Sequence, residues 1–332
     1  MDVLLTVVVC TYNRCEILAK ALNSLALSTL PSTIEWEALV VDNNSADRTR
    51  DVVEGFCRQY PGRFRYVLEP RQGLSFARNA GVRESRGDVL VFLDDDATVD
   101  TGWLWSLTAA LHSGEWAGAG GPIIPRWDTP LPIWLSADDA LAACPYGTFD
   151  AGQAAGPLAR PPFGSNMAFR KEVFEKYGGF RTDLGRSAHN LLGGEDTEFG
   201  KRLLANGEKL RYEPSAVVHH MVAQDRVQKG YVLAWWFWHA RSEIGESGIP
   251  PGPTWSLAGI PLHLFRRLAM STMRWLISIK PSKRFSWKRS VWYIAGEIIG
   301  CYQWSRGAPP QTAPMISGPD TSPERSQTGT PT

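Results

Sequence analysis

Short apolar runs alternate with amphipathic segments between residues 4 and 124. Continuous apolar runs are typical of strands that are buried on both faces of a parallel sheet. Segments whose apolar residues recur every three or four positions are typical of helices that cover such a sheet. We therefore expect an α/β fold with a mostly parallel sheet flanked by helices, whose first strands are 4–10, 37–41, 64–68, 88–93 and 117–124.

The regular alternation fades after residue 125. Residues 125–162 are rich in Pro and Gly, which predicts long loops over the sheet edge rather than a linker. Further strands are expected at 165–170 and 216–220. The predicted helices, besides those that follow the first two strands, lie at about 75–85, 102–112, 170–177, 195–205 and 227–245.

Composition is that of an ordinary folded protein. The chain has 332 residues, of which 43% are apolar and 21% are charged, and its formal net charge of +1 offers no general attraction for nucleic acid. The five cysteines show no CxxC motif and no repeated spacing, which disfavours a structural zinc site and suits reduced thiols. Because the N-terminus lacks the basic region of a signal peptide, we expect a cytoplasmic protein.

Positive charge is concentrated near the C-terminus. Residues 255–306 hold nine basic residues and one acidic residue, together with several aromatic side chains. This composition is typical of helices that lie on an anionic membrane surface, although solvated helix faces would explain the charges nearly as well. Arg274 and Glu297 interrupt the two best candidates for a spanning helix, both near the C-terminus, so we expect no membrane span. For the Trp-rich helix 227–245, core packing is the simplest explanation, and stacking on sugar or lipid contact are the alternatives.

Polar residues follow the predicted strands at the edge where open α/β sheets bind ligands. "TYNR" (11–14) follows the first strand, "DNNSAD" (42–47) the second and "DDD" (94–96) the fourth. The first of these segments lacks the glycines of a dinucleotide site and of a P-loop. Asp42 could accept hydrogen bonds from a ribose or a base, and an Asx-turn is the alternative.

Three adjacent carboxylates at the end of a buried strand repel one another. A divalent cation, Mg²⁺ or Mn²⁺, would offset this repulsion and take its remaining ligands from a diphosphate. Strand alternation would direct Asp94 and Asp96 one way and Asp95 the other. A solvated acidic turn is the alternative.

A second acidic motif, "GGEDTEF" (193–199), lies at the predicted start of a helix. Its glycines would let the backbone approach a substrate while Asp196 acts as a general base, whereas helix capping is the structural alternative. His219 and His220 end the strand predicted next. Because neighbouring strand residues point to opposite faces, we expect at most one of them to face the site, as a metal ligand or a diphosphate donor.

Taken in order, these segments resemble the inverting nucleotide-sugar glycosyltransferases of family 2, which have the GT-A fold. The resemblance covers roughly residues 4–245 and includes "TVVVCTYNR", "ALVVDNNSADRT", "GLSFARNAGVRESRGDVLVFLDDDA", "PFGSNMAFRKEVFEKYGGF" and "GGEDTEFGKRL". It implies that the base is Asp196, with Glu195 in contact with the acceptor, and that Asn166 lies near the donor sugar. Metal ligands would be Asp96, Asp94 and His220, although the match of His220 and Arg226 to the late metal or phosphate contacts of the family is looser. Nucleotide contacts would be Thr11, Tyr12, Asn13, Arg14, Asp42, Arg78, Asn79, Asp94 and Asp95.

The resemblance also implies a function. We expect inverting transfer of a sugar from a nucleoside-diphosphate donor, UDP-linked, to a hydroxyl of a glycan or lipid-linked acceptor in polysaccharide biosynthesis, with an anionic membrane surface as a further partner. The expected parts are a catalytic domain (1–247), a basic, aromatic helical extension (248–306) and a disordered tail (307–332). A nucleotidyltransferase would need a Gly-rich loop after the first strand, and a non-catalytic sugar-binding relative would lose carboxylates that this sequence keeps.

Overall fold

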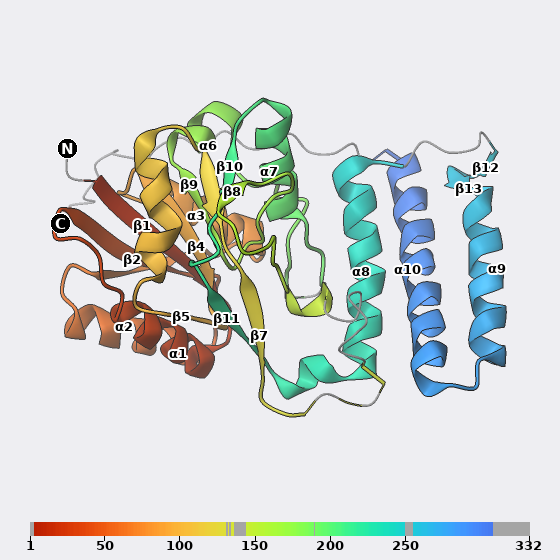
Figure 1. Ribbon diagram of the computed structural model, residues 1–332. Helices are drawn as coiled ribbons and strands as arrows, with labels where there is room; N and C mark the ends of the chain where they lie inside the picture. The colour runs from red at the N-terminus through yellow and green to blue at the C-terminus, as the bar shows by residue number, and fades with distance from the viewer. Residues whose placement is uncertain are drawn as a thin grey trace, which may run out of the picture.

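A computed structural model of the chain describes residues 3–130, 132, 134–135, 144–188, 190–249 and 255–307, and Figure 1 shows a layered α/β body followed by long helices. The strands are β1 (Val3–Thr11), β2 (Ile34–Asp42), β3 (Phe64–Leu68), β4 (Val89–Asp94), β5 (Ala97–Val99), β6 (Gly118–Gly120), β7 (Ile123–Trp127), β8 (Gly156–Pro157), β9 (Met167–Arg170), β10 (Leu210–Tyr212), β11 (Val218–Val222), β12 (Ser256–Leu257) and β13 (Ile260–Pro261). The α-helices are α1 (Cys15–Ala26), α2 (Thr49–Gln59), α3 (Leu74–Glu84), α4 (Trp103–Thr108), α6 (Glu172–Tyr177), α7 (Glu195–Ala205), α8 (Lys229–Ser247), α9 (Leu262–Ile277) and α10 (Pro281–Ser305).

The central sheet has the order β3-β2-β1-β4-β9-β6-β10-β8. β3, β2, β1 and β4 pair in parallel, and so do β6 and β10, whereas β9 is antiparallel to both of its neighbours. The α/β class, the mostly parallel sheet and the helical C-terminal region are therefore as the sequence predicted.

The first strand is buried on both faces, as its continuous apolar run requires. Val7 and Val9 pack in one apolar cluster with Leu18 of α1. Val8, between them, packs in the other cluster with Ala77 of α3. Helices thus cover both faces of the sheet at this strand. The part of the first strands that remains accessible is the edge of the sheet where the polar segments lie.

The expected strand 117–124 is in fact two strands in two sheets. β6 belongs to the central sheet, whereas β7 joins a second sheet with the order β5-β11-β7. The chain changes sheets at Gly121, where a Cβ atom would lie 2.2 Å from the carbonyl oxygen of Ala216, and at Pro122, which has no N–H to donate to a neighbouring strand.

The expected helix 102–112 is also divided, because α4 continues as a 3₁₀-helix, η1 (Ala109–Ser113).

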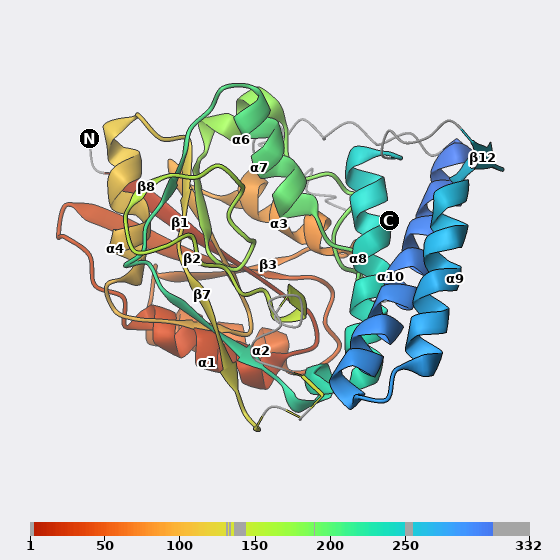
Figure 2. The ribbon, with the colours of Figure 1, turned by 45° about the vertical axis from the view of Figure 1, so that its right-hand side comes forward.

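α8, α10 and α9 pack side by side in that order, beyond the sheet (Figures 1 and 2). Ile244 of α8 shares a small core with Leu264 of α9 and Ile294 of α10. Trp236 is 7% exposed and belongs to a neighbouring apolar cluster, which favours core packing for this tryptophan. The proposed boundary after residue 247 therefore falls between helices that share a core, and residues 308–332 of the expected tail lie outside the described part. None of the helices described is long and apolar enough to cross a membrane.

Candidate active site

The carboxyl ends of β1, β2 and β4 lie next to one another at one edge of the central sheet. Thr11 pairs with Asp42 in the register of β1 and β2, and Cys10 pairs with Asp94 in the register of β1 and β4. The hydroxyl of Thr11 donates to Oδ2 of Asp95 at 2.7 Å. Residues predicted to bind the nucleotide from three separate strands are thus neighbours in space.

Two arginines and a histidine surround Asp95 and Asp96, which are only 6% and 3% exposed. Nη1 of Arg14 lies 3.0 Å from Oδ1 of Asp95 and 2.9 Å from Oδ2 of Asp96. Nη2 of Arg226 lies 2.9 Å from Oδ2 of Asp96, and Nε2 of His220 lies 3.2 Å from Oδ1. Protein cations therefore offset much of the repulsion that the sequence led us to assign to a metal ion. The alternative of a solvated acidic turn is wrong for these two buried residues.

Burial and charge affect the two buried carboxyl groups differently. Burial raises the pKa of Asp95 to about 6, against the opposing charge of Arg14. Burial also acts to raise the pKa of Asp96, but His220, Arg226 and Arg14 outweigh it and hold this pKa below its usual range. Asp96 is therefore the more firmly ionised of the two, which is the state that a metal ligand needs.

Asp96 and His220 offer donor atoms that fit a divalent cation. Nδ1 of His220 lies 2.8 Å from the carbonyl oxygen of Tyr146 and donates to it, and Nε2 lies on the side of Asp96. Burial acts to lower the pKa of His220 but Asp96 raises it, so Nε2 would have to release a proton before it could bind a metal ion. Asp94 is more open, with 35% of its side chain exposed. Within the described residues, no group of three or more His, Cys, Asp and Glu side chains could hold a metal ion by itself. The donor set suits Mg²⁺ or Mn²⁺, which commonly bind through one or two protein carboxylates and complete their coordination with phosphate and water.

The neighbouring strand residue His219 lies on the other side of β11. His220 is buried, whereas His219 is partly exposed and its Nδ1 accepts a hydrogen bond from Nε of Arg126 at 3.2 Å. Only one of the two histidines therefore faces the acidic cluster, as strand alternation predicted. β11 extends beyond the predicted strand, so both histidines lie within it rather than at its end.

The loops after β1 and β2 are tied together beside the acidic cluster. Oδ1 of Asp42 accepts the N–H of Ser45 at 2.8 Å, which is the Asx-turn contact that the sequence also allowed, and Oδ2 accepts the hydroxyl of Tyr66 at 2.8 Å. Burial and the charge of Asp42 raise the pKa of Tyr66 to about 12, so this hydroxyl remains a donor. Asn13 has a φ of 51°, and its side-chain oxygen accepts the N–H of Ala46 at 2.7 Å. These bonds fix the relative position of the two loops at the edge of the sheet.

Arg78 of α3 joins the acidic cluster to the start of α7. Its guanidinium is buried, with Nη2 3.4 Å from Oδ1 of Asp94 and Nη1 hydrogen-bonded to Oε1 of Glu195. Oε2 of Glu195 is buried without a hydrogen-bond partner. Burial raises the pKa of Glu195 to about 7, although Arg78 acts to lower it. One buried arginine thus connects two acidic motifs that are about a hundred residues apart in the sequence.

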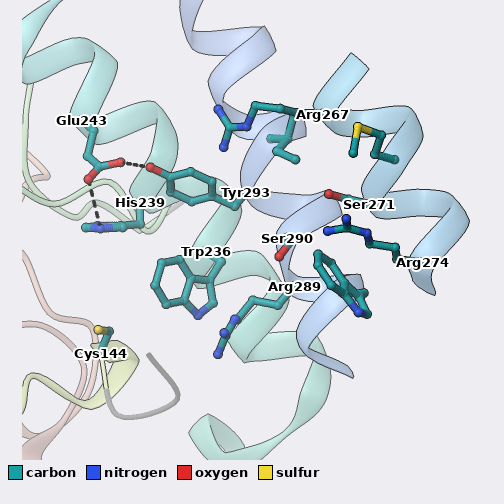
Figure 3. A pocket seen from close by; sticks show the side chains of 13 residues that line it. Cys144, Trp236, His239, Glu243, Arg267, Ser271, Arg274, Arg289, Ser290 and Tyr293 are labelled. Carbon is teal, nitrogen blue, oxygen red and sulfur yellow. Dashed lines mark hydrogen bonds and ion pairs between the residues drawn. The ribbon is translucent and has the colours of Figure 1, made fainter. Parts of the chain in front are cut away.

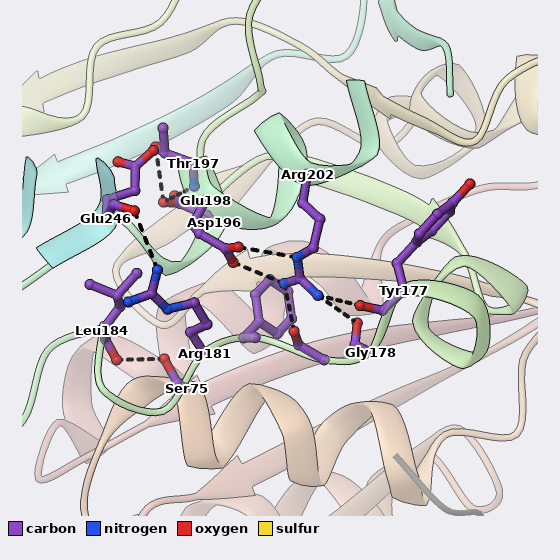
Figure 4. Close-up of polar contacts among 12 residues, drawn as sticks. Ser75, Tyr177, Gly178, Arg181, Leu184, Asp196, Thr197, Glu198, Arg202 and Glu246 are labelled. Atoms are coloured by element: carbon purple, nitrogen blue, oxygen red, sulfur yellow. Dashed lines mark hydrogen bonds and ion pairs between the residues drawn. The ribbon is translucent and has the colours of Figure 1, made fainter. Parts of the chain in front are cut away.

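Asp196, the second residue of α7, accepts two backbone N–H groups. Its Oδ2 accepts from Gly164 at 2.6 Å, and its Oδ1 accepts from Thr197 at 2.7 Å, a contact drawn in Figure 4. The first amides of a helix have no partner within the helix, so Asp196 contributes to capping, as the structural alternative supposed. Its side chain is nevertheless less buried than that of Glu195, which leaves part of the carboxylate open.

Further polar contacts fix the position of α7 (Figure 4). Arg202 donates to both oxygens of Glu198 and to carbonyl oxygens of the loop after α6. The N–H of Gly193 donates to Oγ of Ser242 on α8 at 2.9 Å. The guanidinium of Arg181 donates to carbonyl oxygens near the end of α8. The start of α7 is therefore held from both sides, which limits the movement of Asp196.

Two predicted ligand contacts serve the fold instead. Nδ2 of Asn79 donates to the carbonyl oxygen of Phe180, and its Oδ1 accepts the N–H of the same residue, both at 2.8 Å. Asn166 is fully buried; its Nδ2 donates to two loop carbonyl oxygens and its Oδ1 accepts from the indole of Trp103 at 3.0 Å. With their amide groups satisfied by the protein, we withdraw the nucleotide role of Asn79 and the sugar role of Asn166. Tyr12, in contrast, is 36% exposed and open to a ligand.

Two contributors to the site had no signal in the sequence. Tyr66 supports Asp42 from the middle of β3, and Tyr146 supports His220 through its backbone carbonyl from the Pro- and Gly-rich stretch. Every residue has a backbone carbonyl group, so the sequence could not indicate the contact from Tyr146, and only the fold reveals it. Arg226, for which the family match was loose, forms one of the ion pairs of Asp96.

A methyl group at Gly164 is expected to disturb Arg78, because a Cβ there would lie 2.1 Å from Nη2 of that side chain. Arg78 is held between Asp94 and Glu195 and cannot move aside without losing one of those contacts. We expect Gly164→Ala to lower the free energy of unfolding by about 1–3 kcal/mol in chemical denaturation. Gly102→Ala is the control, since nothing lies within 4 Å of a Cβ at that position. Equal stability of the two variants would mean that Arg78 adapts without loss.

Comparison with known proteins identifies the family. The sequence model of Glycosyl transferase family 2 matches residues 6–178. The succinoglycan biosynthesis protein ExoM of Rhizobium meliloti (strain 1021) is 33% identical over 230 residues, which are 68% of each chain. A glucosyl-dolichyl phosphate glucuronosyltransferase of Haloferax volcanii is 26% identical over 243 residues, covering 72% of this chain and 75% of its own.

Solved structures agree with the fold. The mannosyltransferase PcManGT from Pyrobaculum calidifontis, in complex with GDP-Man and Mn²⁺, superimposes with a TM-score of 0.59 at 20% identity. The match covers 91% of this chain and 88% of that chain. The extent of the family match and the identity with ExoM show that the chain belongs to glycosyltransferase family 2.

Proposed function

We propose that this glycosyltransferase moves a sugar from a nucleoside-diphosphate donor, UDP-linked, to a hydroxyl of a glycan or lipid-linked acceptor, with inversion of the anomeric carbon. The observation that carries the proposal is the buried Arg78, which contacts Asp94 on one side and Glu195 on the other. It links the sheet edge with its acidic cluster to the helix start that bears Asp196. A nucleotide-sugar donor could therefore be held on the Asp94 side of Arg78, and the attacking hydroxyl of the acceptor on the Glu195 side.

The donor would lie along the carboxyl ends of β1, β2 and β4. Thr11, Tyr12, Asn13 and Arg14 would contact the nucleotide from one loop, and Asp42 would accept a hydrogen bond from the ribose or base. Asp94 and Asp95 would border the diphosphate. Arg14 and Arg226 already lie at the acidic cluster, so they could turn part of their positive charge toward phosphate oxygens.

Asp96, His220 and Asp94 would hold Mg²⁺ or Mn²⁺. Such an ion, when bound, neutralises charge that develops on the leaving diphosphate. Support comes from the donor atoms of Asp96 and His220, 3.2 Å apart, and from the Mn²⁺ in the complex of the similar mannosyltransferase. The nucleotide sugar of that complex is GDP-Man. The donor screen described below therefore compares UDP-linked sugars with sugars linked to other nucleotides.

Asp196 would take the proton of the acceptor hydroxyl as that oxygen attacks the anomeric carbon from the face opposite the diphosphate. Direct attack needs no covalent enzyme intermediate and inverts the configuration. Glu195 would contact the acceptor and position Arg78. Two relatives support a glycan or lipid-linked acceptor by their names, since one belongs to succinoglycan biosynthesis and another acts on a glucosyl-dolichyl phosphate. We place the enzyme in the cytoplasm, at the cytoplasmic face of a membrane.

A donor screen tests this proposal. We expect the chain with Mn²⁺ to hydrolyse or transfer from one or a few of several UDP-, GDP- and dTDP-sugars, and EDTA to abolish the reaction. NMR of the first product should show the anomeric configuration opposite to that of the donor. A chain that unfolds cooperatively yet uses no donor would contradict the proposal and favour a non-catalytic sugar-binding protein.

A further inference from the structure

The outer face of α9 carries a continuous apolar stripe. Leu262, Phe265, Ala269, Met273 and Leu276 are three or four positions apart, so they lie along one side of the helix. All five are exposed, and the exposed fraction reaches 56% for Met273 and 64% for Leu276. We call these five residues the outer stripe.

α9 packs against the rest of the protein through its opposite side. Leu264 and Leu268 belong to the core shared with α8 and α10. Arg267 and Arg274 flank a cavity of about 610 Å³ between the three helices (Figure 3). Cζ of Arg274 lies 4.7 Å from the ring centroid of Trp287. A helix at the surface of a soluble protein normally turns its polar side to water. α9 instead presents apolar residues outward, opposite its packed side.

The turn between α9 and α10 continues this surface. Ile277 is 69% exposed and Ile279 is 93% exposed. Three exposed basic residues follow at once, Lys280, Lys283 and Arg284. Apolar tips bordered by basic side chains are suited to an interface between water and lipid, where each kind of group meets its preferred surroundings.

The charge around the outer stripe indicates what covers it. Residues 255–306 contain nine basic residues, and their one acidic residue, Glu297, is paired with Arg267. In Figures 1 and 2, α9 is the outermost helix, and of the described chain only the short strands β12 and β13 lie past its end. A second copy of the chain would bring two strongly positive surfaces together, which costs free energy. An anionic lipid surface offers both opposite charge and an apolar layer.

We propose that the outer stripe and the α9–α10 turn bind an anionic lipid bilayer, with α9 lying in the plane of the membrane surface. The apolar side chains enter the boundary between headgroups and acyl chains, and Lys280, Lys283 and Arg284 contact lipid phosphates. Trp255, which is 76% exposed and lies next to the start of α9, extends the same surface. The inference uses no residue of the candidate active site, so its failure would remove the placement at a membrane face and leave the proposed sugar transfer untouched.

Sedimentation of the full chain with lipid vesicles tests the inference, without donor or acceptor present. We expect binding to vesicles of phosphatidylglycerol and phosphatidylcholine and little binding to phosphatidylcholine alone. Added salt should weaken binding, because the screening length falls from about 30 Å at 0.01 M to about 8 Å at 0.15 M. Each of Lys280→Gln, Lys283→Gln and Arg284→Gln should lower the partition coefficient about fivefold.

A matched pair of variants separates this face from net charge. Leu276 and Leu27 are both 64% exposed, but Leu27 lies at the end of α1 on the sheet domain. Leu276→Glu should weaken vesicle binding at least about tenfold, whereas Leu27→Glu should change it far less. Equal effects of the two variants, or no binding by the parent chain, would overturn the inference. A dimer that Leu276→Glu dissociates, seen in analytical ultracentrifugation without lipid, would assign the face to self-association and would equally overturn it.

Discussion

Replacing Asp196 by Asn is expected to lower the rate of sugar transfer by at least about 100-fold, since a positioned general base contributes about 10²- to 10⁴-fold in rate. Donor affinity should stay close to that of the parent chain. Asn keeps the size of Asp and one oxygen, so it can still accept one of the two N–H groups, from Gly164 or Thr197, that Asp196 accepts. The lost hydrogen bond should cost about 1 kcal/mol of stability. Steady-state kinetics, calorimetry of donor binding and thermal melting measure the three quantities.

Glu198→Gln is the matched control for Asp196→Asn. Glu198 is also an acid in the first turn of α7, but it binds Arg202 rather than lying open to an acceptor. We expect Glu198→Gln to lose some stability and to keep most of its activity. If Asp196→Asn transfers sugar at nearly the parent rate, Asp196 is only a capping residue. Glu195, whose burial raises its pKa to about 7, would then be the base to test as Glu195→Gln.

Asp96→Asn is expected to impair both stability and nucleotide binding. The carboxylate of the parent chain pairs with Arg14, Arg226 and His220. In the variant, Arg14 would still pair with Asp95. Breaking a buried ion pair by removing one partner typically costs about 3–5 kcal/mol, because the remaining charge is left buried without compensation. Chemical denaturation should therefore show a loss of this size. Calorimetry in Mn²⁺ should show UDP affinity reduced at least about tenfold.

The parent chain in EDTA is the control that isolates the metal. EDTA should weaken UDP binding as Asp96→Asn does, but it should leave the stability of the nucleotide-free chain unchanged. Arg14 and Arg226 provide a competing explanation, since they could bind the diphosphate without a metal ion. Undiminished UDP affinity in EDTA would favour the arginines and remove the metal from the proposed mechanism.

Local sequence pattern determined the architecture of the first half of the chain. Strands buried on both faces need continuous apolar runs, and β1, β2 and β4 carry them. The carboxyl ends of parallel strands meet at one edge, so the order of strands and polar segments is enough to place 11–14, 42–47 and 94–96 together. α7 was also predictable, because glycine and acidic residues mark its start.

Tertiary structure alone decided how the polar groups are used. Asn79 and Asn166 have the residue types of ligand contacts, but only the fold shows that Phe180, Trp103 and loop carbonyl groups satisfy them. The pairing of Arg78 with Glu195 joins residues 117 positions apart, and no local period encodes such a contact. The division of residues 117–124 between two sheets depends on how closely Ala216 approaches Gly121.

The C-terminal helices show most plainly what the sequence pattern alone cannot determine. Sequence determined that α9 has apolar and basic residues at helical spacing, because spacing depends only on the geometry of the helix. It could not determine which side of α9 faces the protein, because that depends on where α8 and α10 pack. The structure buries Leu264 and leaves Leu276 exposed, and this difference distinguishes a core contact from the surface that we propose binds lipid.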